Sequence, residues 1–169
     1  DFFSEKPFDM SELLSIIKEW SIKHSFEVVL DKYQSMNIFN FTFSNKTKLK
    51  VDFVHHPHKR VEEGVTWKSI AIDSLLDIAI NKLLTINQRT TVKDFVDLYF
   101  LLQSHSLYDL MEGVKVKYGV KLETLLISSD FLKVDDFTFL PRMIKPLKLN
   151  DLVSFFRDQA MRLSKESVE

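Results

Sequence analysis

Residues 75–102 read LLDIAINKLLTINQRTTVKDFVDLYFLL, and this stretch decides how the rest of the chain is interpreted. Apolar residues recur every three or four positions on both sides of the polar segment NQRTT, which predicts two helices joined by a short turn. Ser74 is expected to cap the first helix, because a serine oxygen can accept a hydrogen bond from a free N–H group of the first turn. Both helices also carry charges beside their apolar stripes. Buried charges are expected to be paired or to bind a ligand, since an isolated one is costly.

The first helix of this pair is expected to place a lysine within its apolar stripe. At about 100° per residue, Lys82 falls inside the stripe, and Arg89 returns to the same face if the helix extends that far. Two interpretations of these cations stay open. They lie at helix ends or close an ion pair with an aspartate of the second helix, or Lys82 contacts phosphate as a mobile point charge. The apolar members of the stripe are Leu75, Ile78, Ala79 and Ile86.

The second helix is expected to be apolar nearly all round, which argues for burial on both sides. Asp94 and Asp97 lie together opposite its main stripe, flanked by Leu98 and Leu101. Their carboxylates are therefore expected to face a protein-lined cleft. Asp97 is also expected to hold Lys93, four positions earlier on the same helix. The main stripe consists of Val92, Phe95, Val96, Tyr99 and Leu102.

The composition of the 169-residue chain is that of an ordinary globular protein, with 45% hydrophobic and 28% charged residues. The net charge of −1 gives no overall attraction to nucleic acid, so such contacts would need a local basic patch. The chain has no cysteine, which excludes disulfides and cysteine-based metal sites. Its three glycines are too dispersed for a Rossmann fingerprint or a P-loop. Without an apolar run of about 18 residues or a signal peptide, we expect a soluble cytoplasmic protein with no membrane contact.

The order of the expected elements is that of an α+β fold, with a small mixed sheet flanked by helices and a helical region after it. We expect one domain over residues 1–73, containing the sheet, and a second over 74–169, containing the helices. A strand end lies at the start of the chain, and residues 130–148 form a loop. The other predicted elements are a helix over 10–24, strands over 26–33, 37–44 and 48–55, a connector over 58–74 with a short extended piece near 67–72, and helices over about 106–118, 121–129 and 149–165.

The third strand carries a charged face. Period-two alternation places Lys50, Asp52 and Val54 on one side of the strand and apolar residues on the other. One interpretation is an edge strand whose charged face meets water. The other is a metal-binding carboxylate, because carboxylates on adjacent strands can hold Mg²⁺.

Three further patterns favour ordinary structural roles. The segment His55-His56-Pro57-His58 lacks the spacing of a zinc site and is better explained as a polar strand end. Phe39, Phe41 and Phe43 suggest base stacking, but phenylalanine is abundant in this chain, so core packing is favoured. Basic residues near the C-terminal helix are diluted by acidic ones, which is typical of a solvated face; they are Lys145, Lys148, Arg157, Arg162 and Lys165.

Together these motifs resemble the AbiEii/AbiGii-type nucleotidyltransferase toxins. The pattern K-x6-R-x3-KD-x2-DLY, which starts at Lys82, resembles the family's third and fourth motifs. Lys50-Val51-Asp52 resembles its K-x-D motif. Asp1-Phe2-Phe3 resembles the end of its first motif, whose preceding Gly-Ser turn and first aspartate are not in this chain, so we expect an active site that is incomplete at the N-terminus.

The resemblance implies a Mg²⁺-dependent enzyme that moves a nucleotide from an NTP to an acceptor, which is tRNA in characterised relatives. It implies a toxin of a toxin–antitoxin or abortive-infection system, with a cognate antitoxin as a possible partner. Asp1 and Asp52 would hold the metal, and Asp94 would act as an acid–base or orienting carboxylate. Basic side chains would contact the substrates; these are Lys50, Lys82, Arg89 and Lys93. The alternative is a non-catalytic module that binds RNA or protein on a degenerate nucleotidyltransferase fold.

Overall fold

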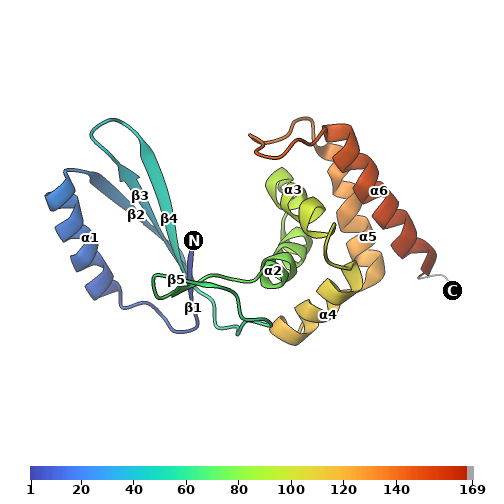
Figure 1. Ribbon diagram of the computed structural model, residues 1–169, viewed down its shortest axis with the longest axis horizontal. Coiled ribbons are helices and arrows are strands. Elements are labelled where there is room, and N and C mark those ends of the chain that lie inside the picture. The colour runs from blue at the N-terminus through green and yellow to red at the C-terminus, as the bar shows by residue number, and fades with distance from the viewer. Residues whose placement is uncertain (167–169) are drawn as a thin grey trace. The chain divides into compact units, whose positions relative to one another are not determined.

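The computed structural model describes residues 1–166 and divides the chain into two compact units, one from Asp1 to Lys59 and one from Arg60 onward. The first unit contains a four-stranded sheet and one helix, and the second is mainly helical (Figure 1). This is the α+β arrangement predicted from the sequence. The boundary lies earlier than the one expected after residue 73, so the connector groups with the helices and not with the sheet. Each unit is described by itself below.

The sheet of the first unit has the strand order β1-β4-β3-β2. β1 (Phe2–Ser4) runs parallel to β4 (Lys48–His55), and β3 (Met36–Thr42) pairs antiparallel with both β4 and β2 (Glu27–Lys32). β4 lies between β3 and β1, but β1 pairs only with Phe53–His55, so among the described strands Lys48–Asp52 pairs with β3 alone. The predicted edge position therefore holds for this half of β4, whereas the burial of Asp52 contradicts a fully solvated charged face.

Helix α1 (Met10–His24) covers one face of this sheet. It begins where Asp9 Oδ1 accepts hydrogen bonds from the N–H groups of Ser11 and Glu12, and ends at Ser25 in the left-handed conformation. Ile17 packs on Phe39 and Phe41, both buried, which confirms that the aromatic strand serves the core. The opposite face of the sheet carries Lys50 and Asp52, because side chains alternate along a strand.

The second unit starts with a β-hairpin and continues with five α-helices. The hairpin pairs β5 (Thr66–Trp67) with β6 (Ile70–Ala71). α2 (Leu75–Gln88) and α3 (Val92–Leu101) form the predicted helix pair, and Ser74 caps α2 by accepting from the N–H of Asp77. The remaining elements are α4 (Leu107–Tyr118), α5 (Thr124–Leu132), the 3₁₀ helix η1 (Lys133–Asp136) and α6 (Leu149–Glu166).

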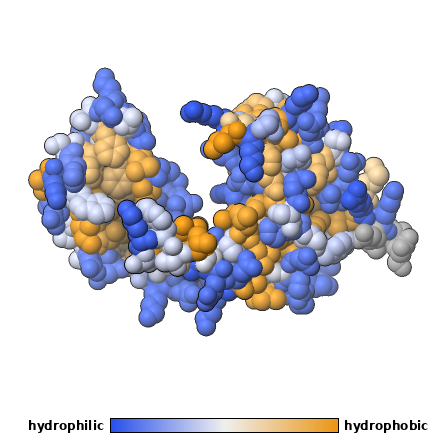
Figure 2. Space-filling view, viewed as in Figure 1, coloured by the Kyte–Doolittle hydropathy of each residue, from blue (hydrophilic) through white to orange (hydrophobic). Residues whose placement is uncertain are grey.

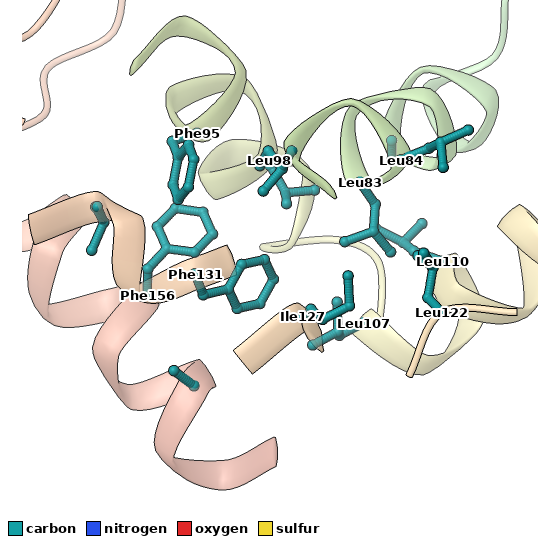
Figure 3. Packing of buried hydrophobic residues seen from close by; sticks show 14 of the residues in the cluster. Leu83, Leu84, Phe95, Leu98, Leu107, Leu110, Leu122, Ile127, Phe131 and Phe156 are labelled. Carbon is teal, nitrogen blue, oxygen red and sulfur yellow. The ribbon is translucent and has the colours of Figure 1, made fainter. Parts of the chain in front are cut away.

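Aromatic and leucine side chains from all five α-helices form one core in the second unit. Phe95 of α3 contacts Phe156 of α6 edge-to-face with ring centroids 4.9 Å apart, and Phe131 of α5 meets the same ring (Figure 3). Gly113 lets α4 approach α2 closely, since a Cβ there would lie 2.4 Å from Cδ1 of Ile80. This core fixes the positions of α2 and α3.

A buried ion pair fastens the connector to the helices. Asp77 and Lys117 are 2.6 Å apart with almost no exposed side-chain surface. Asp77 also accepts hydrogen bonds from the backbone N–H groups of Val61 and Glu62. The carboxylate of α2 thus holds the start of the connector, which explains why residues 60–73 belong to the helical unit.

Several local predictions were wrong in position. The stripe of α2 is rotated from the expected one, so Leu75 is 63% exposed, and α2 ends before Arg89. The helix expected over 121–129 lies at Thr124–Leu132, followed directly by η1 within the expected loop.

Apolar side chains interrupt the hydrophilic surface of both units (Figure 2). Within residues 1–166, no helix has the length and apolar character needed to span a membrane.

Candidate functional site

Asp52 is the buried carboxylate of the sheet unit. It lies mid-strand on β4 with 8% of its surface exposed. Lys50, two residues earlier on the same face, donates from Nζ to Asp52 Oδ2 at 2.7 Å. The other carboxylate oxygen, Oδ1, is buried and has no hydrogen-bond partner within the described residues. An unsatisfied buried acceptor is costly and calls for an explanation, such as an ion or ligand that binds there.

Asp1 is aligned with Asp52 by the register of the parallel strand pair. Phe2 is the Cα partner of Phe53, and their rings stack with centroids 5.2 Å apart. The residues immediately before them are Asp1 and Asp52. Neighbouring positions in register point to the same face of a sheet, so the register is consistent with two carboxylates side by side.

Two histidines, His56 and His58, follow β4 at the end of the strand. In the described part of the chain, no three side chains of His, Asp or Glu gather closely enough to hold a metal ion. The rings of His56 and His58 lie edge-to-face against each other instead, with centroids 5.1 Å apart. The polar strand end predicted for this segment is what the structure contains.

Asp94 is the centre of a charged cluster in the helical unit. Its side chain is 2% exposed. Oδ1 accepts from Lys82 Nζ at 2.9 Å, and Oδ2 accepts from Arg89 Nε at 3.0 Å and from the hydroxyl of Thr91. Burial alone would raise the pKa of Asp94, but hydrogen bonds from Arg89, Thr91 and Lys82 outweigh it and lower that pKa. Asp94 is therefore an anion with both oxygens engaged.

Lys82 bridges two carboxylates. Besides Asp94, its ammonium meets Asp97 Oδ2 at 2.6 Å. Burial acts to lower the pKa of Lys82, and the hydrogen bonds to Asp97 and Asp94 outweigh it and raise that pKa. An ammonium has three N–H donors, so one remains, and the side chain is 26% exposed. The ion pair predicted between Lys82 and an aspartate of the second helix therefore forms. One N–H donor of Lys82 is not used by these two carboxylates.

Asp97 differs from Asp94 although the two are three residues apart. Its side chain is 50% exposed, and its partner is Lys82. The prediction that Asp97 chiefly holds Lys93 is corrected here, because the bend between α2 and α3 brings Lys82 within reach. Arg89 lies just after α2 as its C-cap residue and still reaches Asp94. Lys93 is exposed and lines a pocket of about 410 Å³ beside α3.

Comparison with known proteins identifies the family. Residues 1–164 match the family described as "Nucleotidyl transferase AbiEii toxin, Type IV TA system". The chain belongs to the AbiEii nucleotidyl transferase toxin family. A crystal structure from H. pylori, described as that of a candidate nucleotidyltransferase, is 19% identical with a TM-score of 0.51, and the match covers 100% of this chain and 79% of that one. At that identity the likeness concerns the fold alone. No curated protein matches the chain.

Membership of the AbiEii family confirms the resemblance found in the sequence motifs, the nucleotidyltransferase-like fold and the assignment as a transferase. Within the helical unit, the structure brings together the predicted residues Lys82, Arg89 and Asp94. Within the sheet unit, it pairs Lys50 with Asp52. The two clusters lie in different units.

Two side-chain contacts of this AbiEii chain were not predicted from its sequence. Thr91 donates to Asp94 although it was assigned only to a turn. A signal was present, because Thr-x-x-Asp at a helix start resembles a capping box. Asp77 and Lys117 lie 40 positions apart, and nothing local in the sequence relates them.

Proposed function

We propose that this AbiEii-family chain is a Mg²⁺-dependent nucleotidyltransferase that moves a nucleotide from an NTP to RNA, with tRNA as the expected acceptor. The observation that carries the proposal is the buried, unpartnered Oδ1 of Asp52. Because Lys50 engages only the other oxygen, Oδ1 keeps its lone pairs for a cation.

The residues of the sheet unit fit a magnesium ion. Mg²⁺ prefers oxygen ligands and is usually held by one or two carboxylates, with water and substrate phosphates completing its shell. Asp52 supplies one such carboxylate, and Asp1, aligned with it by the strand register, supplies the second. When bound, the ion would neutralise charge on the triphosphate.

Lys82 is proposed to contact the triphosphate of the NTP. In nucleotidyl transfer an acceptor hydroxyl oxygen bonds to the α-phosphorus while the bond from that phosphorus to pyrophosphate breaks, and the hydroxyl proton passes to water. Negative charge then develops on the pyrophosphate. The free N–H of Lys82 can donate to a phosphate oxygen, and its raised pKa keeps it cationic.

Asp94 is proposed as a positioning residue. Its two oxygens already accept hydrogen bonds from Lys82, Arg89 and Thr91. Taking a proton from an acceptor would require breaking these bonds, so of the two roles considered for Asp94 the orienting one fits better. It fixes Lys82 and Arg89, while Lys50 and Lys93 offer further positive charge to the substrates.

The test uses the full-length gene product with labelled NTPs, total tRNA and Mg²⁺. We expect the wild type to label tRNA, and chelation by EDTA to stop it. Lys82→Ala should abolish transfer while the protein stays folded by circular dichroism. Lys115→Ala is the matched control, because Lys115 is an exposed lysine whose partner, Glu112, lies on the same helix.

Different outcomes separate the parts of the proposal. Transfer that persists in EDTA would remove the metal from the reaction. Equal activity of Lys82→Ala and Lys115→Ala would show that Lys82 takes no part in the reaction. If the wild type transfers no nucleotide to any RNA tried, the proposed transfer fails, and the non-catalytic RNA- or protein-binding module becomes the favoured interpretation.

A further inference from the structure

A pocket of about 410 Å³ opens between α3 and the segment that precedes α6. Its volume is within the range of small-ligand sites. Asp97 lies at this pocket and also pairs with Lys82. The pocket therefore adjoins the Lys82 cluster within the helical unit. Its lining residues are Lys93, Val96, Asp97, Phe100, Pro141, Arg142, Met143, Ile144 and Lys145.

The charge of this pocket is positive. Lys93, Arg142 and Lys145 contribute three cations, and the carboxylate of Asp97 is already engaged by Lys82. Among residues 1–166, none of those three cations takes part in an ion pair. Exposed cations that converge on one pocket without carboxylate partners suit an anionic ligand, and phosphate above all.

The pocket also has an apolar wall. The ammonium of Lys145 lies 5.3 Å from the centroid of the Phe100 ring, which holds that cation in place. Ile144 is fully exposed on the same wall. An apolar and aromatic surface beside cations is a combination that binds single-stranded nucleic acid, since bases pack on the apolar groups and phosphates meet the cations.

We propose that this pocket is the subsite for the end of a single-stranded RNA acceptor. Arg142 and Lys145 contact its phosphates, and Ile144 supports a base. The inference rests on the proposed transfer to RNA and adds where the acceptor binds. A strand is favoured over a free NTP because the exposed Lys148, three positions after Lys145 and outside the pocket lining, continues the positive charge along the chain beyond the pocket.

The test measures RNA binding directly and independently of transfer. A fluorescent single-stranded oligoribonucleotide ending in a free 3′-hydroxyl is titrated with the full-length protein, without NTP and in EDTA, over a series of salt concentrations. Arg142→Gln combined with Lys145→Gln should weaken binding roughly tenfold at physiological salt. The slope of log K against log salt should fall by about 1.4, because each lost phosphate contact on a single strand accounts for about 0.7.

Two controls isolate the pocket. Lys121→Gln combined with Arg162→Gln removes the same charge from exposed positions of the helical unit outside the pocket, and should leave binding within about twofold. Ile144→Ser should weaken binding about threefold or more with the salt slope unchanged, since it removes apolar contact and no charge. Ile144 is fully exposed, so this change should not affect folding.

The outcomes decide between ligands. Equal losses in the pocket variant and the charge control would overturn the proposal, as would a wild type that does not bind the oligonucleotide. Weaker binding of ATP or GTP in Mg²⁺ with unchanged RNA binding would assign the pocket to the free nucleotide and also overturn it. If RNA binds through the pocket and no nucleotide is transferred, the pocket stands as an RNA-binding site and the proposed reaction fails.

Discussion

Asp52 of the sheet unit and Asp94 of the helical unit are both buried, and each is paired with a lysine. They differ in how many hydrogen bonds their carboxylate oxygens accept. Asp94 accepts hydrogen bonds from three side chains, whereas Asp52 accepts from Lys50 alone and has one oxygen without a partner. Burial and a lysine partner therefore do not distinguish a carboxylate that orders its neighbours from one that can take a ligand. The number of hydrogen bonds that each oxygen accepts distinguishes them.

Local structure explains the difference. Asp94 lies in the first turn of α3, where the chain bends and brings Thr91 and Arg89 within reach. Asp52 lies in the middle of β4, and its cross-strand neighbour on β3 is Ile38, which has no donor to offer. A strand interior supplies donors to the side chain only from residues on the same face. The position of Asp52 thus leaves an oxygen free.

The largest effect on stability is expected at a third buried aspartate, Asp77. Like Asp94, it accepts hydrogen bonds at both carboxylate oxygens. Asp77→Ala should lower the free energy of unfolding by about 3–5 kcal/mol, because it leaves Lys117 buried without its partner. Urea unfolding followed by circular dichroism at 222 nm measures this. Glu112→Ala, which breaks the exposed pair with Lys115, should cost less than about 1 kcal/mol. Similar losses in both variants would show that the Asp77 contact does not hold the connector.

Asp52→Asn should lower nucleotide transfer without lowering the stability of the protein. We expect nucleotide transfer to fall by about 100-fold or more, since a neutral amide binds Mg²⁺ more weakly than a carboxylate does. Stability should be unchanged or slightly higher, because the amide no longer leaves an ionised oxygen without a partner. Transfer assays and melting temperatures, measured on the same preparation, test both parts. A clear fall in melting temperature with full activity would assign Asp52 a structural role instead.

Asp94→Asn should differ from Asp52→Asn by lowering the stability of the protein as well as its activity. Removing the anion weakens hydrogen bonds from Lys82 and Arg89, so we expect a loss of about 1.5–3 kcal/mol in the free energy of unfolding. Below the melting temperature, NTP binding should persist while kcat falls, because Lys82 is still present but less well oriented. A KM that rises with kcat unchanged would argue against the positioning role.

The smallest effect is a dependence of stability on pH. Burial would raise the pKa of Asp94, but its hydrogen bonds lower it below the unfolded value of about 3.9. A lowered pKa in the folded state adds stability above the unfolded pKa, and this stability is lost as the pH falls through the folded pKa. Unfolding free energy should therefore decline below about pH 4. Asp94→Asn should show a shallower decline over that range, and an identical decline would contradict the assignment.

Much of the site could be predicted from sequence because its determinants are local. Helical spacing within 75–102 located Lys82 and Asp94, and strand alternation placed Lys50 beside Asp52. Periodicity failed on details that depend on neighbouring elements. The stripe of α2 is rotated relative to the expected one because α4 and α5 pack against it, and Leu75 is left exposed.

The sequence by itself determined the α+β class, the family, the helix pair and the charged residues that these elements carry. Tertiary structure alone decided which of those charges are satisfied. It assigned Lys82 to both Asp94 and Asp97, joined Asp77 to Lys117 and left one oxygen of Asp52 without a donor. The physical reason is that hydrogen bonding depends on distances of about 3 Å between atoms. Such distances are set by how elements pack, and residue spacing along the chain does not specify them.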